Sequence, residues 1–278
     1  MEYKIVGDSC MDLAEDMKGT EVFVNVPLFL HIGEETIRDD ETFEQKLFLE
    51  KMKESSECPK SSCPAPEDFE KYYSEADEIY VITLSSELSG SYNAAMLAKK
   101  DYLDKYPDAK IEVVDSRSAS TGEMLLGRKI DELKRQGKQF EEVVTEIRQY
   151  RDEMQTKFVL ESLENLRKNG RLSHTKALIC DVLNIKPIMK ATPAGTIEKE
   201  SQARGMKSAL VKMIAQVLED AKDSKNRILA ISHCNHRERA EFVKRQVEKL
   251  IAFKDIVIVE QGGLSTLYAN DGGIIISY

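Results

Sequence analysis

The stretch LSSELSGSYNAA, residues 84–95, indicates the fold class of the chain. It follows the apolar, β-branched run EIYVIT and leads into residues of helical composition, so the local order is strand, turn, helix. Such units, repeated along a chain, are typical of a parallel sheet covered by helices. The turn is rich in serine, and its hydroxyls therefore bind a ligand, react with one, or only cap the helix.

This turn carries candidate groups for binding an anion. Ser89 or Ser91 is suited to the N-cap, Gly90 allows the backbone to approach a ligand, and the free N–H groups of the first helical turn attract negative charge. Three predicted strands end in polar pairs: Asp8-Ser9, Ser85-Ser86 and Asp115-Ser116. The carboxyl ends of parallel strands share one edge, where open α/β sheets bind ligands, so these hydroxyls are expected to converge. Capping alone explains the serines equally well.

The first half of the chain repeats the same alternation. Apolar runs predict strands, and amphipathic stretches between and after them predict helices. The predicted strands are residues 3–9, 21–30, 78–86 and 110–116, and the predicted helices are 41–54, 66–75, 91–106, 118–136 and 139–155. We therefore expect an N-terminal α/β domain, residues 1–156, built on a parallel sheet flanked by helices.

The second half has a different pattern. Residues 184–204 predict two strands around a Pro-Ala-Gly turn, which is an antiparallel hairpin. Helical segments at 206–222 and 236–252 flank the apolar run RILAIS, and the runs DIVIVEQ and GGIIISY follow. This order predicts a C-terminal α/β domain, residues 157–278, with a mixed sheet and helices.

Composition and charge limit the classes of partner. The 278 residues are 41% hydrophobic and 32% charged, which is typical of a globular protein. A formal net charge of −9, the lack of a dense Lys/Arg tract and the absence of tryptophan argue against a nucleic-acid partner. We find no signal peptide and no apolar run of roughly 18 residues, so no stable membrane insertion is expected. Five scattered cysteines indicate reduced thiols and a cytoplasmic protein.

Two further loops hold candidate ligand groups. In KSSCPAPEDF, residues 60–69, Ser61 and Ser62 precede two prolines that fix the loop and then a helix start. In LRKNGRL, residues 166–172, Arg171 follows an Asn-Gly turn, and its planar donors suit a carboxylate or phosphate. The alternatives are an ordinary loop with a helix start and a solvated basic turn.

Neither cysteine nor histidine spacing predicts a metal site. Cys58 and Cys63 lack a second pair of ligands, and His233, Cys234 and His236 follow a strand end from which their side chains diverge. Structural zinc needs four ligands in near-tetrahedral geometry. We therefore predict no metal.

Taken in order, these motifs resemble the DegV family, the fatty-acid-binding proteins that serve as the binding subunit of bacterial fatty acid kinase. The matching elements are GDSCMDL, SSCPAP, LSSELSGSYNAA, VVDSRSAS, LRKNGRL, KPIM and SQARGMKSAL. The resemblance covers nearly the whole chain. It implies two α/β domains, the second contributing a lipid slot, with no cofactor and a bound fatty acid as ligand.

The resemblance also implies roles for particular residues. The fatty acid carboxylate would be held at the domain interface by Ser61, Ser62, Ser89, Gly90, Ser91 and Arg171. Arg204 matches a basic residue that faces the kinase, and residues 177–189 would contribute to the slot, although core packing explains them equally well. Ala269 stands where the family has a histidine, and Tyr268 or Asn270 would replace it as a hydrogen-bond donor.

Two functions follow from these residues. The first is a carrier that binds one long-chain fatty acid and presents its carboxylate to a separate kinase subunit, since the chain has no Gly-rich Lys loop for ATP. The second is a serine hydrolase for a small ester or acyl substrate, with serine 62, 89 or 91 as nucleophile. Against the hydrolase, the sequence contains no G-x-S-x-G elbow and no motif that supplies a general base.

Overall fold

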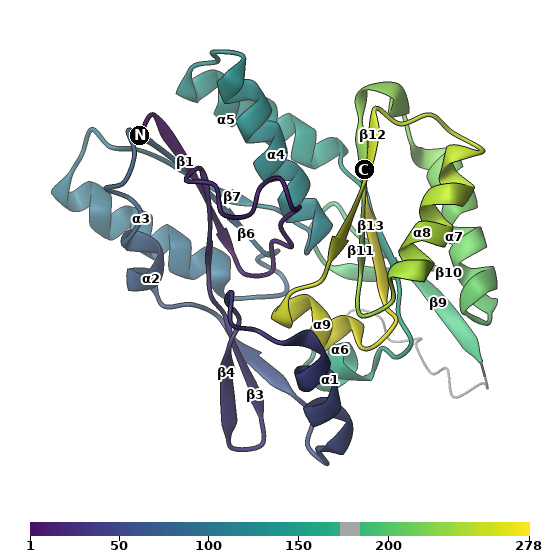
Figure 1. The fold of residues 1–278 in the computed structure, drawn as a ribbon. Coiled ribbons are helices and arrows are strands. Elements are labelled where there is room, and N and C mark those ends of the chain that lie inside the picture. Colours follow the sequence, from purple (N-terminus) through teal and green to yellow (C-terminus); the bar gives the residue numbers. More distant parts are fainter. Residues whose placement is uncertain (173–183) are drawn as a thin grey trace.

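The first sheet is parallel, as the sequence predicts. The computed structural model describes residues 1–172 and 184–278 (Figure 1). The strand order is β2-β1-β6-β7, and every neighbouring pair is parallel. The strands are β1 (Tyr3–Asp8), β2 (Phe23–Val26), β6 (Glu78–Thr83) and β7 (Lys110–Asp115). β6 is buried at all six positions, which explains why its sequence is a continuous apolar run rather than an alternating one.

Helices cover both faces of this sheet. α2 (Pro66–Glu70) and α3 (Ser91–Lys105) lie on its outer face, and α4 (Thr121–Arg135) and α5 (Phe140–Glu153) lie on the other (Figure 1). α4 also contacts two strands of the second sheet, so it lies between the sheets. Its first seven residues are all buried, because both sides of the helix pack against a sheet.

The second sheet is mixed, in the order β10-β9-β8-β13-β11-β12. Its strands are β8 (Thr156–Val159), β9 (Ile185–Ala191), β10 (Ile197–Arg204), β11 (Ile228–His233), β12 (Asp255–Glu260) and β13 (Ile274–Ser277). β11 and β12 are parallel and the other pairs are antiparallel, including the predicted β9–β10 hairpin. α7 (Met206–Asp220) and α8 (Arg237–Glu248) cover its outer face, and a short 3-10 turn (Ser224–Asn226) follows α7. The predicted α/β class with one parallel and one mixed sheet is confirmed.

A third, small sheet was not expected. β3 (Phe29–Ile32) pairs antiparallel with β4 (Glu35–Arg38) and β5 (Lys60–Ser62). The single strand predicted at 21–30 is therefore wrong: it is divided between two sheets at Pro27, which has no N–H for a strand ladder. Beside this sheet lie α1 (Gln45–Glu54), α6 (Glu164–Lys168) and α9 (Gly263–Ala269) (Figure 1).

The carboxyl ends of the parallel strands meet at one edge, as predicted. The Asp8 carboxylate at the end of β1 accepts a hydrogen bond from the Leu84 amide beyond β6, at 2.9 Å. Asp115 at the end of β7 accepts bonds from the Ser86 amide at 3.1 Å and from the Ser86 hydroxyl at 2.6 Å. None of the described helices combines the length and apolar character needed to cross a bilayer.

Candidate functional site

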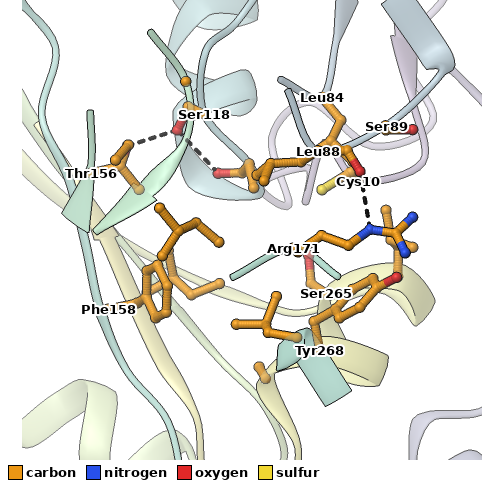
Figure 2. A pocket seen from close by; sticks show the side chains of 18 of the residues that line it. Cys10, Leu84, Leu88, Ser89, Ser118, Thr156, Phe158, Arg171, Ser265 and Tyr268 are labelled. Atoms are coloured by element: carbon orange, nitrogen blue, oxygen red, sulfur yellow. Dashed lines mark hydrogen bonds between the residues drawn. The ribbon is translucent and has the colours of Figure 1, made fainter. Parts of the chain in front are cut away.

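A cavity opens at this edge and is lined by both halves of the chain. It encloses about 810 Å³, including the part that opens to solvent. Its wall is mainly apolar: Leu28, Leu84, Leu88, Ala119, Phe158, Leu160, Leu166, Ala191, Ile197, Leu264, Ala269 and Ile275. Figure 2 shows Leu84, Leu88 and Phe158 around the space. A long apolar ligand fits such a wall, because each buried methylene gains free energy on leaving water.

One end of the cavity gathers polar groups from four segments. The Ser61 hydroxyl lies 3.1 Å from the Tyr268 hydroxyl, and the Arg171 guanidinium carbon lies 5.7 Å from the centre of the Tyr268 ring. The Ser89 side chain lines the same end (Figure 2). Three hydroxyls and a guanidinium therefore surround one region of an otherwise apolar space, and such donors suit a carboxylate.

Arg171 is held by backbone carbonyls. Its Nε donates to the carbonyl of Leu88 at 3.2 Å, and its Nη1 donates to the carbonyl of Asn169 at 2.6 Å. Gly170, with φ of +78°, makes the turn that brings Arg171 back toward the cavity. The two bonds restrict the rotamers of a long side chain, which lowers the entropy lost when it binds an anion.

The serines of the 84–95 stretch serve different purposes. Ser85 donates to the carbonyl of Gly195 at 2.7 Å and so ties the tip of the β9–β10 hairpin to the first sheet. Ser89 faces the cavity, and its hydroxyl lies 3.1 Å from that of the buried Ser91. The predicted N-cap position is wrong, because Gly90 and not Ser89 or Ser91 occupies it. Ser89 Oγ nevertheless accepts a hydrogen bond from the Ser91 amide, the first of α3, at 3.2 Å, and the Ser91 side chain turns inward to hydrogen-bond Asp8.

Tyr268 is placed by two buried carboxylates from the first half of the chain. Asp39 accepts hydrogen bonds from the amides of Gly263 at 2.7 Å and Leu264 at 2.8 Å, at the start of α9. Asp12 accepts a bond from the Gly262 amide at 2.7 Å. A Cβ at Gly263 would lie 2.5 Å from Asp39 Oδ1, so only glycine allows this approach. Burial raises the pKa of Asp39 to about 6 and that of Asp12 to about 7.

A second buried group lies beneath the sheet edge. Ligand atoms of Asp8, Cys10 and Glu123 lie within 4.8 Å of one another, and all three side chains are buried. Burial raises the pKa of Glu123 well above its usual value and also raises that of Asp8. Burial therefore favours the protonated form of the Glu123 carboxyl group.

Comparisons with known proteins match this fold over its full length. The family model described as "uncharacterised protein, DegV family" matches residues 2–278. The chain belongs to the DegV family. A DegV domain-containing protein of Streptococcus gordonii is 36% identical, and the match covers 100% of this chain and 99% of the relative.

Two solved structures of DegV family proteins are similar throughout. The first is a DegV family protein of Ruminococcus gnavus refined with vaccenic acid, with a TM-score of 0.97 and 47% identity, covering 100% of this chain and 99% of that one. The second is the fatty acid kinase (Fak) B3 protein of Streptococcus pneumoniae, loaded with linoleic acid. Its TM-score is 0.91 at 33% identity, covering 100% of this chain and 99% of that one.

The structure brings four of the predicted ligand residues of this DegV chain to the cavity and places the others elsewhere. Ser61, Ser89, Arg171 and Tyr268 line it. Ser62 faces away from Ser61, because neighbouring residues of a strand alternate, and its exposed hydroxyl lies 3.0 Å from His31 Nε2. Gly90 is exposed and lies beside Cys63, since a Cβ built on Gly90 would be 3.1 Å from Cys63 Sγ. Ser91 is buried.

The remaining candidates lie outside the cavity of this DegV protein. Asn270 accepts a hydrogen bond from Asn165 Nδ2 at 3.1 Å and lines a separate, polar cleft. Arg204 is exposed at the end of β10. Of the segment 177–189, residues 177–183 lie outside the described part of the chain, and none of residues 184–189 lines the cavity.

Sequence reasoning missed several lining residues and the carboxylates behind them. The motif VVDSRSAS marked Ser118 without assigning it a role, Phe158 lay in no predicted element, and Ile275 was only part of an apolar run. The pair Gly262-Gly263 before LSTLYA was the available signal for α9, because glycines permit the close approach of Asp39. Ala269, in place of the family histidine, does line the cavity, directly beside Tyr268.

The raised pKa of Asp39 predicts a pH-dependent stability. The pKa of Asp39 in the folded state is about 6, above the usual 3.8. Between these two pH values the folded state binds more protons than the unfolded state does. The free energy of unfolding therefore falls as pH rises through 6. Between pH 5 and pH 7, the wild type should lose about 1 kcal/mol of unfolding free energy relative to Asp39→Asn. Urea unfolding of both proteins at the two pH values measures this difference. Parallel pH profiles would show that Asp39 stays ionised.

Proposed function

We propose that this protein binds one long-chain fatty acid in the cavity, with its carboxylate among Ser61, Ser89, Arg171 and Tyr268. The observation that carries the proposal is an apolar space with cation and hydroxyl donors gathered at one end. Residues 1–156 and 157–278 form the two domains of this proposal, and both contribute walls to the slot.

The energetics favour an acyl chain as the occupant. Burying a chain of about 16 carbons, at about 0.8 kcal/mol per methylene, gives ample free energy for tight retention. Removing the carboxylate from water is costly unless several donors replace the lost hydration. Arg171, already oriented by Leu88 and Asn169, supplies a charged donor, and the hydroxyls of Ser61 and Tyr268 supply neutral ones.

Solved relatives support this ligand class. The Ruminococcus gnavus protein was refined with vaccenic acid, and the Streptococcus pneumoniae Fak B3 protein was loaded with linoleic acid. Both structures cover this whole chain, so the slot walls have counterparts in proteins that hold fatty acids.

A separate kinase subunit is the proposed partner. The relative described as a fatty acid kinase B3 protein supports this assignment, as does the lack of an ATP-binding Gly-rich Lys loop in this sequence. Arg204, exposed at the end of β10, is our candidate for the contact surface. We place this function in the cytoplasm, in keeping with the reduced Cys10, Cys58, Cys63 and Cys234.

The geometry favours a carrier over a serine hydrolase. Ser62 has a histidine partner, but this pair is exposed and Ser62 is not part of the cavity wall. Ser89 lies in the wall, and the hydroxyl beside it belongs to Ser91 rather than to a general base. The serine that has a histidine partner thus lies outside the cavity wall, and the serine in the wall has another serine as its hydroxyl neighbour.

Extraction of the bound lipid tests the proposal. The protein is produced in bacteria, examined by native mass spectrometry, and extracted with organic solvent. We expect a fatty acid at near one-to-one occupancy, retained in the control Ser62→Ala and reduced in Ser89→Ala. Lipid-free protein that neither rebinds a fatty acid nor competes for a fluorescent one would overturn the carrier. Ester turnover abolished by Ser62→Ala would establish the hydrolase instead.

A further inference from the structure

The end of the cavity opposite Arg171 is also polar. Ser118 and Thr156 line it and lie across the space from Arg171 and Tyr268 (Figure 2). Both side chains are buried, with 4% and 6% of their surfaces exposed. A slot made only for a hydrocarbon tail has no use for hydroxyls where the tail ends, because an alkyl group accepts no hydrogen bond.

Four buried hydroxyls form a chain that starts in this wall. Ser118 Oγ lies 2.7 Å from Thr156 Oγ1, and Thr156 Oγ1 lies 2.9 Å from Ser277 Oγ. Ser277 Oγ in turn lies 2.8 Å from Thr121 Oγ1 at the start of α4. The chain thus runs from the cavity wall into the core, where Ser277 and Thr121 are fully buried.

The chain has one proton more than it has links. Four hydroxyls carry four protons, and three links use three of them. If both hydroxyls at the slot end donate inward, the last proton falls on Ser277 or Thr121, which have no other acceptor among the described residues. If the two core hydroxyls donate outward, the last proton falls on Thr156 or Ser118, which both line the slot. The second direction avoids an unpaired donor in the core.

The described residues offer Ser118 only a poor acceptor for this proton. The carbonyl of Ala119 lies 3.5 Å away, beyond the usual 2.5–3.0 Å range of a hydroxyl donor. Gly122 leaves room for this side chain, since a Cβ there would lie 2.0 Å from Ser118 Oγ. With Thr156 donating to Ser118, the Ser118 hydroxyl offers its proton to whatever occupies the end of the slot.

A hydroxyl donor of this kind suits a neutral oxygen of the ligand. Arg117 also lines this end, but its Nη1 donates to Asp152 at 3.1 Å, and that ion pair is about half exposed. Asp152 also accepts a hydrogen bond from Arg151 Nε at 2.9 Å, so this carboxylate is shared by two guanidinium groups. A second carboxylate on the ligand would compete with Asp152 for Arg117, whereas a hydroxyl or keto oxygen needs only the hydroxyl donor.

We propose that the acyl chain held by this slot carries a hydroxyl or keto oxygen at or near its far end, bound by Ser118. This inference rests on the proposed function and names its substrate class as oxygenated fatty acids. Thr156, Ser277 and Thr121 act as positioning residues that orient the Ser118 proton toward the slot.

A competition experiment with matched ligand pairs tests the inference. Delipidated protein binds a fluorescent fatty acid, which is displaced by ω-hydroxy fatty acids and by unsubstituted acids of equal length. For the pair that fits best, Ser118→Ala should weaken the ω-hydroxy acid about tenfold and leave the unsubstituted acid unchanged or slightly tighter. The ratio of the two affinities cancels any general loss of binding.

Two control variants separate this role from a structural one. Thr156→Ser keeps the hydroxyl chain and should keep the wild-type ratio. Thr196→Val removes a lining hydroxyl outside the chain, bonded to Thr192 at 2.8 Å, and should also keep it. Equal weakening of both ligands by Ser118→Ala overturns the inference while leaving the fatty acid carrier intact. Failure of the wild type to bind either acid overturns the proposed function itself.

Discussion

Replacing Arg171 by alanine is expected to weaken the binding of a long-chain fatty acid by roughly 30- to 150-fold, about 2–3 kcal/mol. The size follows from the loss of a hydrogen-bonded charge opposite the ligand carboxylate, in a space whose other walls are apolar. Displacement of a fluorescent fatty acid measures the change. The neutral methyl ester should lose far less affinity, because it offers no charge for the guanidinium to bind.

Two variants distinguish recognition of the carboxylate from damage to the loop. Arg171→Lys keeps the charge but loses the planar donors that bond Leu88 and Asn169, so it should bind with intermediate affinity. Lys168→Ala, in the neighbouring helix α6, removes a charge paired with Glu164 outside the cavity and should leave affinity unchanged. If Arg171→Ala lowered the affinity for the acid and for the ester equally, Arg171 would support the loop and not bind the carboxylate.

The elements that sequence predicted well are those that local pattern determines. The parallel strands are continuous apolar runs, and the β9–β10 hairpin is marked by its Pro-Ala-Gly turn. The small sheet escaped prediction because β5 has only three residues and β4 has no buried position, so neither leaves an apolar periodicity. Pro27 was visible in the sequence, but its effect depends on which sheet each neighbouring strand joins.

Choosing between adjacent candidate residues required the register of a strand. Ser61 and Ser62 are chemically identical, and only the pairing of Leu30 with Ser61 decides which one faces inward. The same holds for Ser89 and Ser91, since the local sequence does not reveal that Asp8 draws Ser91 into the core. Sequence could therefore place a hydroxyl-rich turn at the site without identifying the hydroxyl that lines it.

The position of Tyr268 depends on contacts between distant parts of the chain. Asp39 holds the first amides of α9 across more than two hundred residues, and no local pattern encodes that contact. The sequence reflects this contact only in the glycine at position 263, because a side chain there would collide with Asp39. The aromatic hydroxyl that meets Ser61 is thus fixed by tertiary packing rather than by its own helix.

Replacing Ala191 by phenylalanine should shorten the slot from its inner end and shift binding toward shorter acids. Ala191 lines the cavity and continues the register in which Lys190 pairs with Lys157, which places it near Thr156. A phenyl ring there displaces roughly four methylene groups at about 0.8 kcal/mol each, so a long-chain acid should lose more than a hundredfold in affinity. Competition with a series of saturated acids measures the profile.

The direction of the shift is the informative part of this result. The Ala191→Phe change lies far from Arg171, so an acid short enough to stop before the ring keeps its carboxylate contacts and should bind as in the wild type. Ala191→Val fills less of the slot and should give an intermediate profile, with unchanged thermal stability confirming that both variants fold. Equal weakening for short and long acids would place the tail elsewhere, since only a chain that reaches Ala191 can sense the size of its side chain.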